Sequence, residues 1–180
     1  MDETIRVCGA EYRLVRLLGK GKGGYSYLAE GEEGPVVVKQ IHHEPCAYYS
    51  FGNKLEAERY DYGRLLAAGI PVPKLLAVDE QAERIVKEYA EGPTVLELLR
   101  AGKSAEAWLP QVREMAALAR AAGLNIDYFP ANFVAGSDGK LLYVDYECND
   151  YMDQWSFETW GIQYWTRTPT LEAWLAGHPD

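Results

Sequence analysis

The first half of the chain alternates between apolar and polar positions in a way that predicts antiparallel strands. Residues 11–30 partly alternate on both sides of a glycine cluster, which indicates a strand, a turn and a strand. The β-branched run at residues 36–41 predicts a third strand, and residues 75–78 and 84–89 flank the turn at residues 79–81 as a second hairpin. The residues before position 90 are therefore expected to form mainly a sheet.

One helix is expected within this half, over residues 52–68. Leu55, Tyr62, Leu65 and Leu66 give this segment an apolar stripe at helical spacing. Residues 69–73 contain two prolines, and a proline disfavours helical backbone just before itself, so the helix is expected to end there.

The second half of the chain is expected to be helical with one hairpin. Thr94 followed by Glu97 forms a capping box, which indicates the start of a first helix. Residues 102–104 separate it from a longer helix that continues to about Ala122 and ends at Gly123. Short apolar runs at 133–134 and 141–144 flank a polar, glycine-bearing turn. The chain therefore predicts an α+β fold in two parts, residues 1–90 and 91–180, with a candidate hinge near Ala90.

Three polar residues stand at the ends of the hairpin expected at 133–144. Asn132 follows Asp127 by five positions and directly precedes the first apolar run, and Asp145 directly follows the second. Because a hairpin brings its ends together, these side chains are expected to face one pocket. Carboxylate and amide oxygens bind hard cations, and a carboxylate can accept a proton from an attacking hydroxyl. The spacing therefore suggests a site for phosphoryl transfer.

The glycine cluster near the N-terminus offers a second candidate site. Gly19, Gly21 and Gly24 form a G-x-G-x-x-G pattern, but the β-prone residues 25–29 follow it where a dinucleotide-binding fold needs a helix. No Gly-Lys-Ser/Thr closes the run, so a P-loop is excluded. The remaining interpretations are an ordinary hairpin and a flap that lays backbone N–H groups over phosphates.

Lys39 ends the β-branched run and is the candidate cation for phosphate oxygens. A carboxylate on the helix expected at 52–68 would hold it in place. Glu56 and Glu58 are both candidates, and Glu58 is favoured because it lies beside the apolar stripe, four positions before Tyr62.

Composition narrows the class of protein. The net charge is −9 and the sequence pI about 4.9, so a generally basic nucleic-acid-binding footprint is absent, although a local basic patch around Lys20 and Lys22 stays open. Cys8, Cys46 and Cys148 are odd in number and lack metal-site spacing, which favours reduced thiols. No apolar run is long enough for a membrane span and no signal core follows Met1, so a cytoplasmic protein is expected.

Taken in order, these pieces resemble the eukaryotic-like protein kinase superfamily over roughly residues 12–165. The stretch from Gly19 to Gly24 is similar to the glycine-rich loop, Val37-Val38-Lys39 to V-A-I-K, and residues 125–132 to H-R-D-x-x-x-x-N. Asp145-Tyr146-Glu147 stands at the position of D-F-G and is closer to the Asp-Trp/Phe-Glu of aminoglycoside and choline kinases.

The resemblance implies a two-lobed protein-kinase-like fold that binds ATP and Mg²⁺. The sheet and its one helix would form the N-lobe, and a shortened helical C-lobe would carry the catalytic loop. Lys39 and its partner Glu58 would position the phosphates, Asp127 would act as catalytic base, and Asn132 and Asp145 would bind the metal. The nucleotide would also contact Gly19, Gly21 and Gly24, and backbone groups of the hinge at Glu88, Tyr89 and Ala90 would hold the base.

Several departures from the family pattern change what is expected. Asn125 and Ile126 replace the histidine and arginine of H-R-D, and Phe129 replaces the lysine or histidine that contacts the transferred phosphate. No A-P-E follows Asp145, and the usual C-terminal helices are expected to be missing, as in trimmed RIO-type and lipopolysaccharide-kinase-like members. Glu158 would anchor the catalytic loop amides, and the tryptophans at 155, 160 and 165 are expected in the core.

The function expected from this resemblance is ATP- and Mg²⁺-dependent phosphorylation of a hydroxyl, by an atypical Ser/Thr protein kinase or an autophosphorylating kinase. A small-molecule kinase, a pseudokinase that serves as an ATP-binding scaffold, and a partner-dependent ATPase are the alternatives. The acceptor stays open between a protein and a small molecule. A partner protein that completes the short C-lobe is a further expectation, whereas neither nucleic acid nor membrane is expected.

Overall fold

The computed structural model describes residues 3–21, 23–43 and 53–179 and divides the chain into two compact units. Unit 1 comprises Met1–Tyr60 and Pro73–Tyr89, and unit 2 comprises Asp61–Val72 and Ala90–Asp180. Unit 2 thus includes residues 61–72, which the sequence placed with the first part. Lys22 and Cys46 lie outside the described residues.

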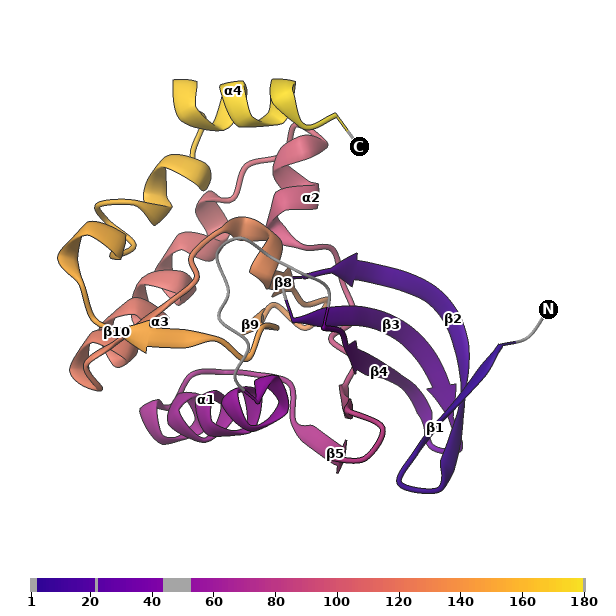
Figure 1. The fold of residues 1–180 in the computed structure, drawn as a ribbon. Coiled ribbons are helices and arrows are strands. Elements are labelled where there is room, and N and C mark those ends of the chain that lie inside the picture. Colours follow the sequence, from indigo (N-terminus) through magenta and orange to yellow (C-terminus); the bar gives the residue numbers. More distant parts are fainter. Residues whose placement is uncertain (1–2, 22, 44–52, 180) are drawn as a thin grey trace. The chain divides into compact units, whose positions relative to one another are not determined.

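Unit 1 is built on a six-stranded antiparallel sheet, in the order β1-β2-β3-β4-β6-β5. The strands span Thr4–Val7 (β1), Ala10–Lys20 (β2), Gly24–Gly31 (β3), Gly34–Ile41 (β4), Leu75–Asp79 (β5) and Arg84–Glu88 (β6). Register shifts between β2 and β3 interrupt their pairing at Leu14/Arg16 and Leu17/Gly19, and such irregularities increase local bending and twist. The long strands β2, β3 and β4 curve together (Figure 1). The sheet and both hairpins expected from the alternating pattern are present.

Apolar side chains form a cluster on each face of this sheet, although β2 is mostly exposed. Val7, Ala29, Val38 and Val86 form a cluster on one face. On the other face Ile41 and Ile85 pack with Leu55 of helix α1 (Lys54–Ala68). Lys39 is paired with Ile85 in the β4–β6 register, so its side chain belongs to the α1 face of the sheet.

Helix α1 follows the predicted stripe only in part. Leu55 and Leu65 are buried, but Leu66 is 52% exposed, so its inclusion in the apolar stripe was wrong. The helix contributes to both units, because residues 54–60 belong to unit 1 and residues 61–68 to unit 2. Leu65 and the following Ile70 are members of the core of unit 2.

Unit 2 combines helices with two small antiparallel ribbons. Its helices are α2 (Val95–Arg100), α3 (Leu109–Ala121) and α4 (Pro169–Gly177), with 3-10 turns at Glu106–Trp108, Pro130–Asn132, Asp153–Trp155 and Gly161–Tyr164. The ribbons pair β8 (Phe133–Ala135) with β9 (Leu141–Tyr143), and β7 (Leu124–Ile126) with β10 (Cys148–Asp150). The β8–β9 hairpin and the Thr94–Glu97 capping box were predicted. The β7–β10 ribbon and α4 were not.

The tryptophans of unit 2 differ in their burial, contrary to the expectation that all three lie in the core. Trp165 is 1% exposed and packs edge-on against Phe133 and Phe157. Trp155, in contrast, is 48% exposed and contacts the partly buried Trp160. The core prediction therefore holds for Trp165 and is wrong for Trp155.

Candidate functional site

The first group of predicted site residues lies in unit 1, on the α1 face of the sheet. Lys39 Nζ forms an ion pair with Glu58 Oε1, and each side chain is only 13% exposed. Glu56 is exposed in the first turn of α1, where its backbone N–H donates to Asn53 Oδ1 at 3.1 Å. Lys39 therefore pairs with Glu58, the glutamate that the sequence analysis favoured over Glu56.

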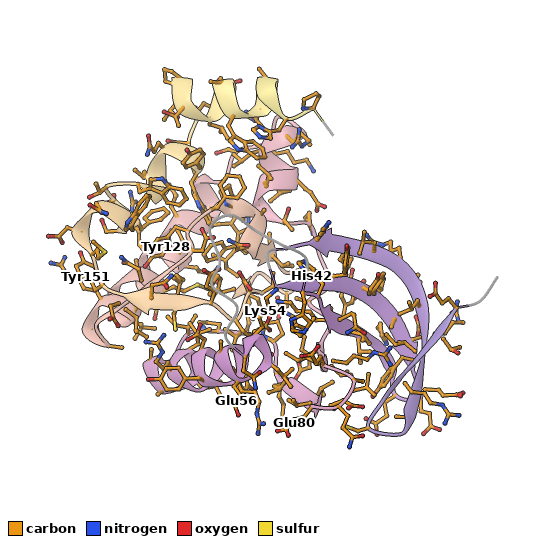
Figure 2. All side chains as sticks on the ribbon, in the orientation of Figure 1. His42, Lys54, Glu56, Glu80, Tyr128 and Tyr151 are labelled. Carbon is orange, nitrogen blue, oxygen red and sulfur yellow. The ribbon has the colours of Figure 1, made fainter. Side chains whose placement is uncertain are left out.

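The beginning of α1 is tied to the sheet by a second lysine. Lys54 is 3% exposed, and its Nζ donates to the backbone oxygen of His42 at 2.5 Å. Figure 2 shows His42 and Lys54 close together, with Glu56 directed to the outer side of the helix. These contacts fix the helix turn from which Glu58 reaches Lys39.

The glycine cluster forms a tight turn between β2 and β3. Gly21 N–H donates to the Gly24 carbonyl at 2.9 Å, and the His42 ring bonds to the Gly21 carbonyl. A side chain at Gly23 would lie 3.9 Å from both Lys39 Nζ and Glu58 Oε1, so the backbone there borders the ion pair. Gly23 was not among the predicted contacts, and nothing in the glycine pattern singles it out.

The other glycines of the cluster have different surroundings. A Cβ at Gly24 would lie 2.4 Å from the Gln40 carbonyl oxygen, so this position is glycine because β4 packs against it. A Cβ at Gly19 would meet nothing within 4 Å, and Gly19 lies within β2. In the predicted hinge, the Glu88 N–H already donates to the Lys74 carbonyl at 2.9 Å, which engages one of the groups expected to bind a base.

The second group of predicted site residues lies in unit 2, where the loop at residues 127–132 meets the residues that follow β9. Asn132 Nδ2 donates to the Asp127 carbonyl at 3.3 Å, and the Val144 N–H donates to the Asn132 carbonyl at 2.9 Å. The Phe129 N–H donates to Asp127 Oδ1 at 3.1 Å. The loop that carries Asp127 and Asn132 is thus bonded to the residue just before Asp145.

A buried tyrosine, Tyr143, joins the two ends of this group. Its hydroxyl accepts the Asp127 N–H at 3.2 Å and donates to the Glu147 carbonyl at 2.7 Å. Burial, and after it the negative charge of Asp145, hold the pKa of Tyr143 well above its ordinary value. The hydrogen bond from the Asp127 N–H lowers this pKa, and the charges of Asp127 and Glu147 raise it further. Three carboxylates therefore lie near one phenol. Nothing in the sequence pattern indicated this role of Tyr143.

The segment that the sequence analysis compared with a catalytic loop, residues 125–132, is anchored by a residue other than the expected Glu158. Glu158 was expected to hold the loop amides, but it forms an exposed ion pair with Arg113 Nε at 2.7 Å, so that expectation was wrong. Trp165 instead donates its indole N–H to the Tyr128 carbonyl at 2.7 Å, within the core. A buried indole needs a hydrogen-bond partner, and the loop backbone supplies it.

The residues that depart from the kinase pattern are packed in apolar or backbone contacts. Ile126 is 3% exposed, and Asn125 Nδ2 donates to the Met152 carbonyl at 2.9 Å. The Phe129 ring contacts Tyr164 and Trp174 edge-on, with ring centroids 5.5 and 4.9 Å apart. The side chain at this position therefore contributes aromatic contact where the kinase pattern has a hydrogen-bond donor.

Two of the side chains in unit 2 suit a hard divalent cation. The Asn132 amide directs its Nδ2 to the Asp127 carbonyl, so Oδ1 is the end that a cation can use, and Asp145 supplies a carboxylate. Among the described residues, no three His, Cys, Asp or Glu side chains form a metal-binding group. Mg²⁺ is commonly held by one or two protein ligands together with substrate phosphates, and this donor set fits that mode.

Comparison with protein-family models and with curated proteins identifies no relative. No helix within the described part of the chain is long and apolar enough to cross a membrane.

Proposed function

We propose that this protein is an ATP- and Mg²⁺-dependent phosphotransferase with a protein-kinase-like fold. The observation that carries the proposal is the bonding of Asp127, Asn132 and the residue before Asp145 into one group in unit 2. The Lys39–Glu58 ion pair in unit 1 adds the phosphate-binding cation that such a transfer needs. The order of these residues along the chain is the order of the kinase motifs.

The proposed reaction moves the γ-phosphoryl group of ATP to a hydroxyl. The bond between the γ-phosphorus and the β–γ bridging oxygen breaks, a bond to the acceptor oxygen forms, and the acceptor proton passes to Asp127. Lys39, held by Glu58, binds phosphate oxygens, while Asn132 and Asp145 hold Mg²⁺. The metal, when bound, offsets the negative charge of the phosphates. Asp127 needs hydrogen-bond reach to the acceptor for this role.

We propose a protein Ser/Thr hydroxyl as the acceptor, including one on the protein itself. Incubation of the purified chain with Mg²⁺ and γ-labelled ATP, alone and with a general protein substrate, tests this. We expect labelled protein from the wild type and a loss of about a hundredfold to a thousandfold for Asp145→Asn, which removes one charge from the metal ligands. Asp138→Asn is the matched control, because Asp138 lies in the exposed turn of the same hairpin.

A second candidate function is that of a nucleotide-binding scaffold that does not transfer phosphate at a useful rate. The packing of Phe129 against Tyr164 and Trp174 favours it, since no donor for the transferred phosphate comes from this position. ATP that raises the melting temperature while no label appears in protein or free phosphate would favour the scaffold. Free labelled phosphate alone would instead indicate an ATPase, and transfer to added small alcohols a small-molecule kinase.

A further inference from the structure

The β7–β10 ribbon stops one pair before it would join Asp127 to Glu147. Its register pairs Asp150 with Leu124, Asn149 with Asn125 and Cys148 with Ile126. The next pair in this register is Glu147 with Asp127. In an antiparallel ladder every second pair bonds directly through its backbone N–H and C=O groups, across about 2.9 Å. Tyr151 N–H donates to the Gly123 carbonyl at 2.8 Å in the same register, so Glu147 with Asp127, four residues further along, falls at such a pair.

The Tyr143 hydroxyl occupies that place. The Asp127 N–H donates to the hydroxyl oxygen at 3.2 Å, and the hydroxyl donates to the Glu147 carbonyl at 2.7 Å. One oxygen atom therefore stands between a donor and an acceptor that would otherwise pair with each other. The two segments are bridged and held apart at the point where the ladder ends.

The tyrosine is itself held firmly in unit 2. It is fully buried, its ring packs against Phe133 with centroids 5.2 Å apart, and its N–H donates to the Pro71 carbonyl at 2.9 Å. It is also the last residue of β9, two positions before Asp145.

We propose that the Tyr143 hydroxyl is a spacer that sets the separation between the segment carrying Asp127 and the segment carrying Asp145. It is thereby a positioning residue for the proposed phosphoryl transfer, on which this role rests. The base and the metal ligand belong to two short segments, and the hydroxyl fixes the gap between them. Without the hydroxyl, the Asp127 N–H donates to the Glu147 carbonyl directly, and Asp127 moves toward Glu147.

Tyr143→Phe tests the spacer because it removes one oxygen atom and keeps the ring packed on Phe133. Tyr151→Phe is the matched control: its hydroxyl donates to Asp153 Oδ1 at 2.8 Å, outside this group. The first readout is structural, by NMR. We expect a scalar coupling across a new hydrogen bond from the Asp127 amide nitrogen to the Glu147 carbonyl carbon in Tyr143→Phe, absent from the wild type and the control.

The second readout is kinetic. We expect kcat of Tyr143→Phe to fall about tenfold to a hundredfold, as for other residues that orient metal ligands, with a higher Mg²⁺ requirement and an unchanged KM for ATP. A purely structural role would change the melting temperature without this split between kcat and KM. Wild-type kcat in Tyr143→Phe, or an unchanged Asp127 amide signal, would overturn the proposal.

The two readouts separate the spacer from the enzyme assignment. If the wild type transfers no phosphate, the proposed function fails, and the coupling measurement still decides whether Tyr143 separates the two segments. If the coupling appears but kcat is unchanged, the hydroxyl is a spacer without a positioning role, and the proposal is overturned.

Discussion

Lys39 on strand β4 and Glu58 on helix α1 form an ion pair that is mostly shielded from water. Removing one member of such a pair leaves the other charge poorly solvated. This destabilises the protein more than removing one member of an exposed pair does. The register of β4 directs Lys39 to the α1 face of the sheet, and the Glu58 carboxylate holds its ammonium group in place there.

We expect Glu58→Gln to lower kcat/KM for ATP about a hundredfold, because the lysine loses its fixed position over the phosphates. Labelled-ATP assays over a range of ATP concentrations measure this. Glu56→Gln is the control on the same helix, and its activity should equal that of the wild type, since Glu56 is exposed. Equal losses in the two variants would show that helix stability, and not the ion pair, is responsible.

Lys39 belongs to unit 1 and Asp145 to unit 2, and the proposed phosphoryl transfer uses both residues. We expect Lys39→Met and Asp145→Asn each to lower kcat strongly, and the double variant to be scarcely worse than the poorer single variant. Groups that act as a unit in catalysis show this non-additivity. Losses that multiply in the double variant would mean that the two residues serve independent functions.

The hydrogen bond from Trp165 to the Tyr128 carbonyl is expected to stabilise the protein, because it anchors the loop that carries Asp127. Trp165→Phe leaves that buried carbonyl without its indole donor, and we expect a loss of about 1–3 kcal/mol in the free energy of unfolding. Urea unfolding measures it. The exposed Trp155 provides the comparison, because Trp155→Phe should stay within about 0.5 kcal/mol of the wild type.

Tyr128 predicts a loss of stability at high pH. Burial raises its pKa to about 12 from an ordinary value of 10.0. Between these pH values the unfolded chain gives up the proton and the folded chain keeps it, so the stabilisation is complete below pH 10 and declines as pH rises toward 12. The linked loss is about 2–3 kcal/mol.

Urea unfolding at several pH values from 9 to 12 checks this for the wild type and Tyr128→Phe. Tyr143 and Cys148 also have raised pKa values, the latter about 11, so the wild type should lose stability through several groups. The variant should lose less than the wild type by the amount linked to Tyr128. Parallel curves for the two proteins would rule out this linkage.

The residues whose roles follow from local sequence were predictable. A lysine at the end of a β-branched run and a glutamate beside a helical apolar stripe are defined by their own elements, and Lys39 and Glu58 do pair. The α+β class followed from the same periodicities. The β8–β9 hairpin was likewise visible, because its apolar runs flank a turn of polar residues and glycine.

Other features depend on contacts between segments that are distant in sequence, and the local sequence pattern does not indicate them. The hydroxyl of Tyr143 meets Asp127 and Glu147 only because β7 and β10 pair, and three-residue strands carry too little alternation to be recognised. Glu158 and Trp165 lie close in sequence, yet burial made the indole the anchor of the loop and left the carboxylate exposed. Leu66 fitted the helical stripe and still faces solvent, since α1 is covered along only part of its surface.

The sharing of helix α1 between the two units has a consequence for dissection of the protein. The chain changes from one unit to the other after Tyr60, after Val72 and after Tyr89. A fragment that begins at residue 91 lacks Leu65 and Ile70, which belong to the core of unit 2, and would leave apolar side chains uncovered. Cutting at one peptide bond therefore cannot yield two self-sufficient folding pieces.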